Sequence, residues 1–307
     1  MSSYVLRRLG QLVLTLFIAS AVIFGAMQLV PGDPILAIFF PRVPSQEVYA
    51  KLRVDLGLDK PFLIRYVNLM DRIVLHGDLG ESIKQRRSVG TIIKENLPPT
   101  AELALAGILV SVAVGLPLGI IAAITRYRLV DNLVMVLALI GVSTPSFWLG
   151  ILLILAFSLT LGWLPTSGVG GIQRLVLPAL TLGLYGGGYL ARFTRSSILE
   201  VKHLEYVTTA RAKGLGESTI NLRHILRNAL IPIVTMFGLL AGYMLGGAVI
   251  VETVFGRTGI GHVLVSAIIG KDFPLVQGLL IFIVGVFSTV NLVVDISYAY
   301  IDPRVKY

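Results

Sequence analysis

The sequence predicts an all-α membrane protein with about six transmembrane helices. Of its 307 residues, 55% are hydrophobic and only 14% are charged, and the mean hydropathy of +0.84 is well above that of a soluble globular domain. Six stretches are long and apolar enough to cross a hydrocarbon core about 30 Å thick, which takes about 20 helical residues. The chain contains no cysteine, which excludes disulfide frameworks, thiolate metal sites and cysteine nucleophiles.

The predicted spans cover residues 9–30, 101–124, 133–159, 175–190, 230–251 and 276–300. In the first span, Ala19-Ser20-Ala21 fits a signal-peptide cleavage site, but the apolar run continues for more than a turn beyond it, which is too long for a signal peptide. The fourth span is interrupted by Pro178 and by the triplet Gly186-Gly187-Gly188. Membrane helices tolerate such residues where neighbouring helices satisfy the freed backbone groups, so we keep both segments as spans.

Residues 31–99 form the one long polar insertion, and we expect it to be a small extracytoplasmic cap of short helices. It has charges of both signs. Its boundaries have turn chemistry, with Pro31-Gly32-Asp33-Pro34 after the first span and Leu97-Pro98-Pro99-Thr100 before the second. Apolar residues recur within it at helical spacing, namely Val48, Leu52, Leu56, Leu63, Tyr66, Val67 and Met70.

The sequence thus divides into three regions. Residues 1–30 are the N-terminus and first helix, residues 31–99 are the insertion, and residues 100–307 are a five-helix core with a cytoplasmic elbow at about residues 199–228.

The distribution of basic residues predicts the orientation in the membrane. With six crossings, the arginines and lysines near span ends gather on one side, which the positive-inside rule makes cytoplasmic. These residues are Arg7, Arg8, Arg126, Arg128, Arg192, Arg195, Lys202, Arg211, Lys213, Arg223, Arg227, Arg304 and Lys306. Both termini are therefore expected in the cytoplasm, and the net charge of +9 indicates orientation rather than a nucleic-acid partner.

The sequence shows no pattern typical of an enzyme. The four histidines, His76, His203, His224 and His262, include no pair at the i, i+4 spacing of a zinc helix. The glycine-rich pieces lack the lysine that a phosphate-binding loop requires. We therefore predict no catalytic, metal or cofactor site in this chain, so any ATP that drives its function has to bind to a partner.

Ionisable groups within the spans are few. Asp295 lies inside the last span, and Glu102 and Asp131 lie near the ends of others. We expect Asp295 to be an interfacial or interhelical hydrogen-bond partner near the cytoplasmic end rather than a substrate contact. Since carriers driven by ion gradients and intramembrane enzymes need polar groups at membrane depth, the sequence weighs against both, which remain the alternatives.

The connection between the fourth and fifth spans predicts two short helices. Leu199, His203, Tyr206 and Ala210 share one helical face, and Gly214 is placed to end the first helix. A turn then leads into a second helix, which re-enters the membrane at residues 229–232.

This elbow carries small residues at Ala210, Ala212 and Gly214. Small side chains suit docking into another protein. Binding of a basic surface helix to anionic lipid fits equally well.

The same region resembles the coupling motif of permease subunits of binding-protein-dependent ABC importers, in the oligopeptide, dipeptide, nickel and glutathione branch. That motif reads roughly E-A-A, three residues, G, then nine residues to I-x-L-P, and residues 205–214 followed by 224–232 are similar to it, with Tyr206-Val207 in place of the two alanines. Further similar segments are residues 29–34, 77–82, 143–150, 252–261 and 302–304, where Gly256-Arg257-Thr258 replaces a form that often contains Trp-Pro.

The resemblance implies a type I importer permease with an external insertion, located in the bacterial inner membrane. It implies a homologous second permease subunit, two cytoplasmic ATPases that carry ATP and Mg²⁺, and an extracytoplasmic solute-binding protein. The expected solute is a peptide or a similar small molecule. The residues it implies for ATPase coupling are Glu205, Tyr206, Ala210, Arg211, Ala212, Lys213 and Gly214.

No residue is assigned to the solute from the sequence. Phe147, Trp148 and Tyr243 suit either the lining of a cavity or a role as interfacial anchors and packing residues. Because aromatic side chains near span ends more often have the second role, these residues are left unassigned.

Overall fold

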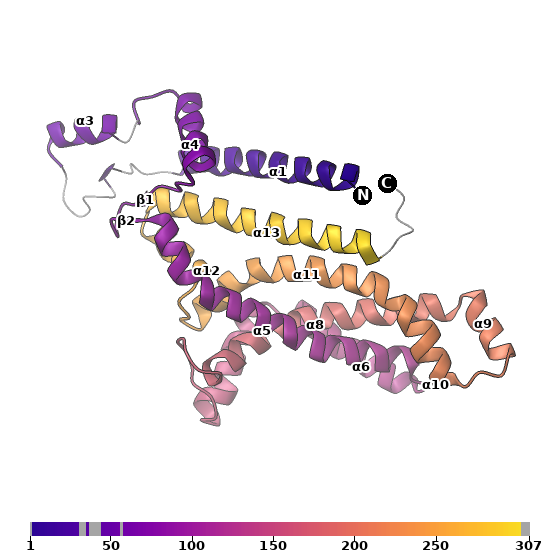
Figure 1. Cartoon of the computed structure of the whole chain (residues 1–307). Helices are drawn as coiled ribbons and strands as arrows, with labels where there is room; N and C mark the ends of the chain where they lie inside the picture. Colours follow the sequence, from indigo (N-terminus) through magenta and orange to yellow (C-terminus); the bar gives the residue numbers. More distant parts are fainter. Residues whose placement is uncertain (1, 31–34, 37–43, 56–57, 302–307) are drawn as a thin grey trace.

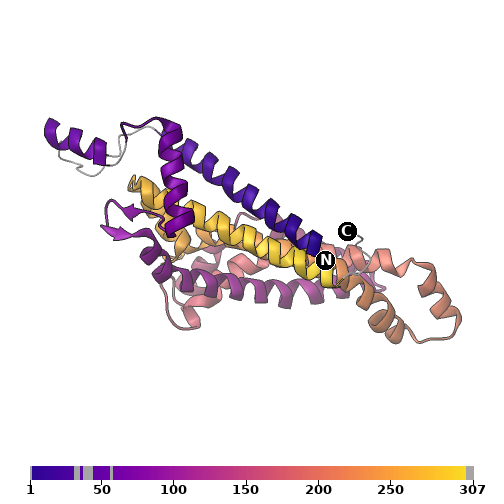
Figure 2. The same ribbon diagram turned by 45° about the horizontal axis from the view of Figure 1, so that its top comes forward.

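The structure is a computed structural model that describes residues 2–30, 35–36, 44–55 and 58–301. Long helices lie side by side along its length, with α9 at one end and α3, α4 and the β1–β2 hairpin at the other (Figure 1). These are called here the α9 end and the hairpin end. The start of α1 and the end of α13 both lie toward the α9 end (Figures 1 and 2).

The α-helices are α1 (Ser2–Leu29), α3 (Gln46–Asp55), α4 (Phe62–His76), α5 (Val89–Ile124), α6 (Arg128–Ser143), α7 (Ser146–Leu153), α8 (Gln173–Lys202), α9 (Glu205–Ala212), α10 (Glu217–Thr219), α11 (Arg227–Val254), α12 (Ile260–Ile269) and α13 (Phe273–Ile301). Two π-helical turns, η1 (Ile154–Thr160) and η2 (Ile220–Leu226), follow α7 and α10. The antiparallel strands β1 (Glu81–Ser82) and β2 (Arg87–Ser88) pair Glu81 with Ser88.

The predicted all-α membrane fold is confirmed. Segments Val5–Leu29, Val89–Ile124 and Phe273–Ser297 are each long and apolar enough to cross a membrane. Helices α8 and α11 contain the predicted fourth and fifth spans and are 30 and 28 residues long, which is about 40 to 45 Å at 1.5 Å per residue. The predicted turn at Pro31 to Pro34, the apolar Leu56 and the tail from residue 302 lie outside the described residues.

The prediction of one continuous third span over residues 133–159 was wrong. Helices α6 and α7–η1 meet at an angle of 104°. The cause is Pro145, which has no N–H and pushes the residue before it out of the helical region. Thr144 accordingly has φ −79° and ψ 121°. The predicted span is therefore a bent pair of helices.

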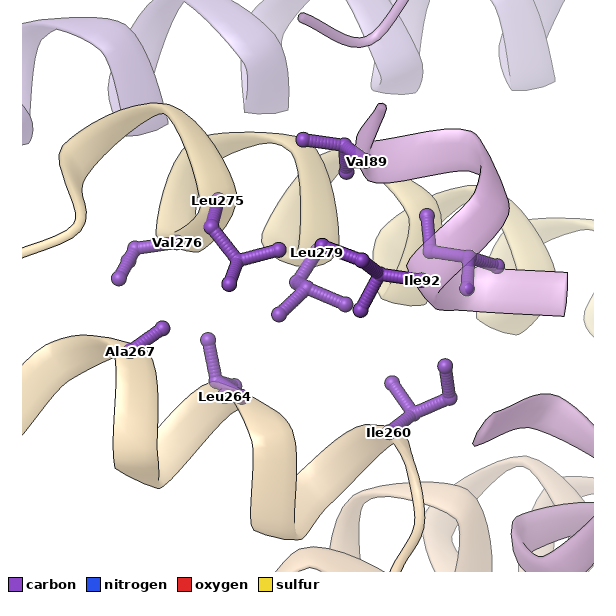
Figure 3. Close-up of a cluster of buried hydrophobic side chains, with 9 residues drawn as sticks. Val89, Ile92, Ile260, Leu264, Ala267, Leu275, Val276 and Leu279 are labelled. Carbon is purple, nitrogen blue, oxygen red and sulfur yellow. The ribbon is translucent and has the colours of Figure 1, made fainter. Parts of the chain in front are cut away.

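Helix α5 also differs from its prediction, because it begins at Val89 rather than after the prolines. Pro98 and Pro99 lie inside the helix. Val89 and Ile92, before the prolines, are buried against Leu264 of α12 and other apolar residues of α12 and α13 (Figure 3). Burial of this first part of α5 stabilises a continuous helix through Pro98 and Pro99, where the local sequence favours a turn.

Helix α4 of the insertion packs on α1 through one face. Tyr66 is buried beside Phe24, and its hydroxyl lies 2.9 Å from the Ser20 hydroxyl. Two of the apolar residues expected on that face, Leu63 and Val67, are instead exposed. The spacing thus predicted the helix but only part of its packed face.

Glycines allow α5 and α8 to lie in close contact. A methyl group added at Gly115 would lie 2.6 Å from the Gly187 carbonyl oxygen, and one at Gly119 would lie 2.5 Å from that of Ala191. Small residues are what bring helix backbones together in a bilayer.

The glycine triplet does not interrupt α8. Its three members face three neighbours, with Gly186 against Met244 of α11, Gly187 against α5 and Gly188 against Ala138 of α6. Gly186 and Gly188 therefore allow α11 and α6 to approach α8 closely, whereas a methyl group at Gly187 would make an ordinary contact with α5.

We expect Gly119→Ala to lower the free energy of unfolding by about 1–3 kcal/mol, because the added methyl overpacks the α5–α8 contact. Thermal unfolding in detergent, followed by tryptophan fluorescence, measures it. The matched control is Gly10→Ala, at a helical position with open space around it, which should be neutral or stabilise by about 0.5–1 kcal/mol. Equal melting of the two variants would contradict the close contact.

Candidate functional site

The elbow at the α9 end begins where α8 stops. His203 and Leu204 break the helix, and Leu204 has the extended dihedral angles φ −73° and ψ 146°. The prediction of a single helix from Leu199 onward was therefore wrong. Leu199 belongs to the end of α8. The break turns α9 so that Val207 and Ala210 pack on η2. A straight continuation of α8 would leave these two apolar side chains exposed.

The inner face of the elbow is apolar. Val207 and Ala210 are buried with Ile220 and Ile225 of η2, in one cluster with residues of α5, α8 and α11. Ala210 therefore belongs to the packing of the elbow and not to its outer face. This cluster attaches α9 to the main bundle.

Polar contacts hold both ends of α9. The Tyr206 hydroxyl donates to the His224 carbonyl at 3.2 Å, and the Asn228 amide donates to the Tyr206 oxygen at 2.8 Å. Arg211 donates to Glu217 at 2.8 Å and so lowers the pKa of Glu217. With a lowered pKa, the carboxylate stays ionised at neutral pH, and the pair is lost only as the pH falls through that pKa.

Gly214 ends the elbow helix, as the sequence predicted. Its φ is +79°, in the left-handed region that favours glycine. Its N–H donates to the Arg211 carbonyl at 2.9 Å, and the Leu215 N–H donates to the Ala210 carbonyl at 3.3 Å. These bonds satisfy two of the last carbonyls of the helix.

The outer face of the elbow is exposed. Glu205 lies in the first turn of α9, where a carboxylate is favourable. The exposed residues of this face are Glu205, Thr208, Thr209, Ala212, Lys213 and Gly214. The elbow is thus a firmly attached projection with small and charged residues outward.

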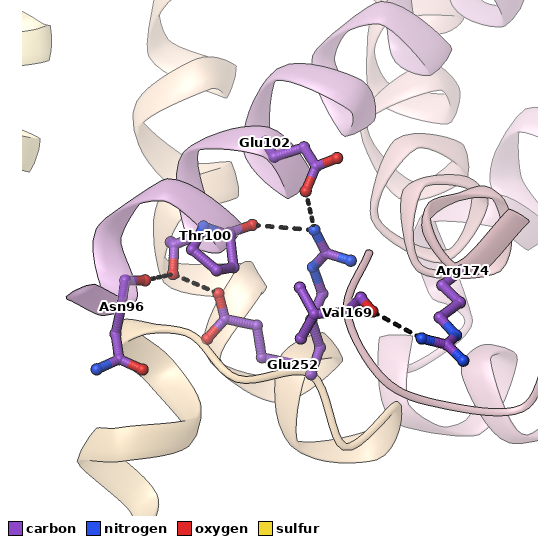
Figure 4. A network of polar contacts seen from close by, with 8 residues as sticks. Asn96, Thr100, Glu102, Val169, Arg174 and Glu252 are labelled. Carbon is purple, nitrogen blue, oxygen red and sulfur yellow. Dashed lines mark hydrogen bonds and ion pairs between the residues drawn. The ribbon is translucent and has the colours of Figure 1, made fainter. Parts of the chain in front are cut away.

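A second polar site at the hairpin end was not predicted from the sequence (Figure 4). Glu252 of α11 is buried and accepts hydrogen bonds from the Thr100 hydroxyl at 2.5 Å and from the backbone N–H groups of Gly261 at 2.8 Å and His262 at 3.1 Å. The N–H of Ile260 donates to the Thr100 oxygen at 2.8 Å. The carboxylate therefore ties α5, α11 and α12 together.

Arg257 adds an ion pair to this site. Its side chain is buried, pairs with Glu102 of α5 and donates to the Pro99 carbonyl at 3.5 Å. The sequence placed Arg257 only in a loop segment. Its partner lies 155 positions away, so no local pattern could have identified the pair.

Nearby, Asp272 holds the hairpin. Its buried carboxylate accepts from the Ser82 hydroxyl at 2.5 Å and from the Lys84 N–H at 3.2 Å. The hairpin is thus attached to the turn between α12 and α13.

Each acid predicted near a span end is paired with an arginine. Besides Glu102, Asp131 accepts two hydrogen bonds from Arg195 at 2.5 and 2.7 Å. Asp295 lies 2.9 Å from Arg8 of α1, which confirms its predicted interhelical contact. Over the described part of the chain, no three His, Asp or Glu side chains group as a metal site would.

We expect Gly214→Val to loosen the elbow, because a side chain in the left-handed region costs about 1–2 kcal/mol. Trypsin cleavage after the exposed Lys213 of the purified chain should speed up by roughly 5- to 30-fold. Gly216→Val is the control, since Gly216 has φ −65° and open space around it. Equal cleavage of the two variants would show that the turn is not specified by Gly214.

Comparison with known families matches almost the whole chain. Residues 115–307 match the family described as the binding-protein-dependent transport system inner membrane component, and residues 1–104 match the N-terminal region of such components. The chain is 43% identical over 307 residues to the glutathione transport system permease protein of Salmonella typhimurium, with all of both chains covered. It is 40% identical over 315 residues to a putative peptide transport system permease protein of Brucella abortus, again with full coverage of both.

Solved structures of transporters share the fold. An inward-facing MetNI methionine ABC transporter chain has a TM-score of 0.60 at 17% identity, covering 69% of this chain and 96% of its own. A chain of an amino acid ABC transporter with histidines has a TM-score of 0.55 at 16% identity, covering 70% and 95%.

These matches bear out the resemblance found in the motifs. The family consists of transport permeases and not of enzymes, which confirms the predicted non-catalytic role. The chain belongs to the family of binding-protein-dependent transport system inner membrane components, as the membrane-spanning permease subunit of an ABC importer.

Proposed function

We propose that this permease forms half of a pathway for peptides or glutathione-like solutes and that α9 couples it to cytoplasmic ATPases. The observation that carries the proposal is the elbow itself, which is exposed on its outer face and firmly attached on its inner face. A projection held in this way transmits a push from a partner to α8 and α11, between which it lies in the chain.

The seven predicted coupling residues divide into two roles in this proposal. Exposed Glu205, Ala212 and Lys213 contact the ATPase, and Gly214 ends the helix beside them. Tyr206, Ala210 and Arg211 act indirectly, because their contacts lie within this chain.

The proposed complex contains a second permease, two ATPases that bind ATP and Mg²⁺, and a solute-binding protein. The α9 end then lies in the cytoplasm of a bacterium, together with both chain termini, and anionic lipid neutralises nearby basic residues. The insertion at the hairpin end faces the binding protein across the outer surface of the inner membrane.

The solute class is inferred from relatives. One related permease is named for glutathione and another for peptides. Both names describe amide-linked solutes with carboxylates, and we propose the same chemistry for this chain.

We expect Glu205→Arg combined with Ala212→Trp to abolish co-purification of the ATPases with the mildly solubilised chain, while the second permease is retained. The substitutions alter charge and shape on the outer face and leave the buried contacts intact. Glu47→Arg in α3, also exposed, is the control. Unchanged ATPase recovery from the double variant would contradict docking at α9.

We expect uptake into proteoliposomes holding the whole complex to need ATP and the binding protein. Addition of a protonophore should leave the initial rate unchanged, since the acids near span ends are paired with arginines rather than available for proton transfer. Uptake that collapses with the proton gradient and ignores ATP would instead favour an ion-coupled carrier.

A further inference from the structure

Helix α8 carries polar side chains on a face that the other described helices cover only in part. Tyr185, Tyr189, Arg192 and Ser196 are spaced by four, three and four residues, so they fall within a sector of about 60° on the helix. Tyr185 is half-buried, and the other three are exposed. The glycine triplet, by contrast, is buried against α5, α6 and α11.

A tyrosine of α11 extends this face. The rings of Tyr243 and Tyr185 stack with centroids 5.7 Å apart and an interplanar angle of 17°, and their hydroxyl oxygens are 3.4 Å apart. The ring of Tyr189 lies 5.3 Å from that of Tyr185. Tyr243 is 57% exposed. The three tyrosines thus form one aromatic surface across α8 and α11.

The position of these tyrosines along their helices does not fit a lipid-facing role. Tyrosines that anchor a helix in a bilayer lie at the membrane surfaces, whereas Tyr243 lies near the middle of the predicted fifth span, residues 230–251, and stacks on Tyr185 inside the fourth, residues 175–190. Tyr189 lies next to the end of the fourth span. A phenol hydroxyl that faces hydrocarbon without a full set of partners is costly. The surface is therefore suited to water or to a polar solute.

Arg192 places a cation at one end of the surface. It lies seven residues beyond Tyr185, which is about 10 Å along the helix. Arg195, one turn further on, is paired with Asp131, but none of the ion pairs among the described residues involves Arg192. An extended tripeptide is also about 10 Å long.

We propose that Tyr185, Tyr189, Arg192, Ser196 and Tyr243, called here the tyrosine–arginine face, line the solute pathway. The tyrosine hydroxyls and rings contact the amide groups of a short peptide, and Arg192 binds its terminal carboxylate. This proposal rests on the importer function proposed above, and it specifies where that function is carried out and for which solute chemistry. A carboxylate complements an unpaired guanidinium through two parallel hydrogen bonds.

The absence of native cysteine allows a direct test in the assembled complex. Single variants Tyr189→Cys, Arg192→Cys, Ser196→Cys and Tyr243→Cys are treated with a charged methanethiosulfonate without ATP, and the mass of this chain is followed. The controls are Leu109→Cys and Leu137→Cys, whose native side chains are 69% and 60% exposed. Because thiolates form in water, the face should react at least roughly tenfold faster than the controls.

Slow reaction of Tyr189→Cys and Tyr243→Cys, equal to that of the controls, would overturn the proposal by placing this face against lipid or the second permease. ATP-driven uptake by the same vesicles would then still support the importer function. If the wild-type complex shows no ATP-driven uptake at all, the importer function itself is overturned.

The carboxylate contact is tested with Arg192→Gln and Arg192→Lys. Uptake of trialanine or glutathione, whichever the wild-type complex imports faster, is compared with uptake of its C-terminal amide. Arg192→Gln should reduce the acid-to-amide ratio by roughly tenfold relative to wild type, and Arg192→Lys should retain part of it. Arg128→Gln, at an exposed position outside the face, should not change the ratio. Equal losses for acid and amide would overturn the assignment of Arg192 to the carboxylate.

Discussion

The close contact between α5 and α8 is the constraint on which the rest of the bundle depends. Lipid tails are as apolar as leucine, so helices in a bilayer are held by packing and hydrogen bonds rather than by burial from water. The glycines of α8 allow α5, α6 and α11 to approach its backbone at one level. With its small residues covered by neighbours, α8 keeps Tyr189, Arg192 and Ser196 on the remaining open face. The packing of the bundle therefore determines which side of α8 stays open.

Helix α11 connects the two polar regions of the molecule. One end follows η2 directly out of the elbow, and the other carries Glu252, whose carboxylate holds α5 and α12. A rigid helix with fixed contacts at both ends transmits displacement along its length. In the coupling proposed above, α11 is the element that joins the elbow to the network around Arg257 at the hairpin end. Tyr243 lies between these two regions on the same helix.

Local sequence predicted the features that depend on local chemistry. Apolar length identified the spans, and glycine chemistry identified Gly214 as the end of α9. The start of α5 was missed because Pro98 and Pro99 read as a turn, whereas long-range packing of Val89 keeps the helix continuous. The bend at Pro145 could have been predicted from proline chemistry. It was missed because the long apolar run on both sides of Pro145 indicated a single span. The pairing of Arg257 with Glu102 depends on the tertiary fold alone, and no local pattern encodes it.

The pairing of α1 with α13 has a consequence for synthesis of the chain. These two helices lie along each other (Figure 2) and are joined by Arg8 and Asp295, yet α1 begins at Ser2 and α13 only at Phe273, so α13 is made much later. At about 5 to 20 residues per second, α1 waits for tens of seconds before its partner emerges. Throughout that interval α1 persists in the bilayer without α13, which its apolar length permits, while α4 already packs on it. The same delay leaves the side of α1 that faces α13 open to pairing with α13 of a neighbouring copy.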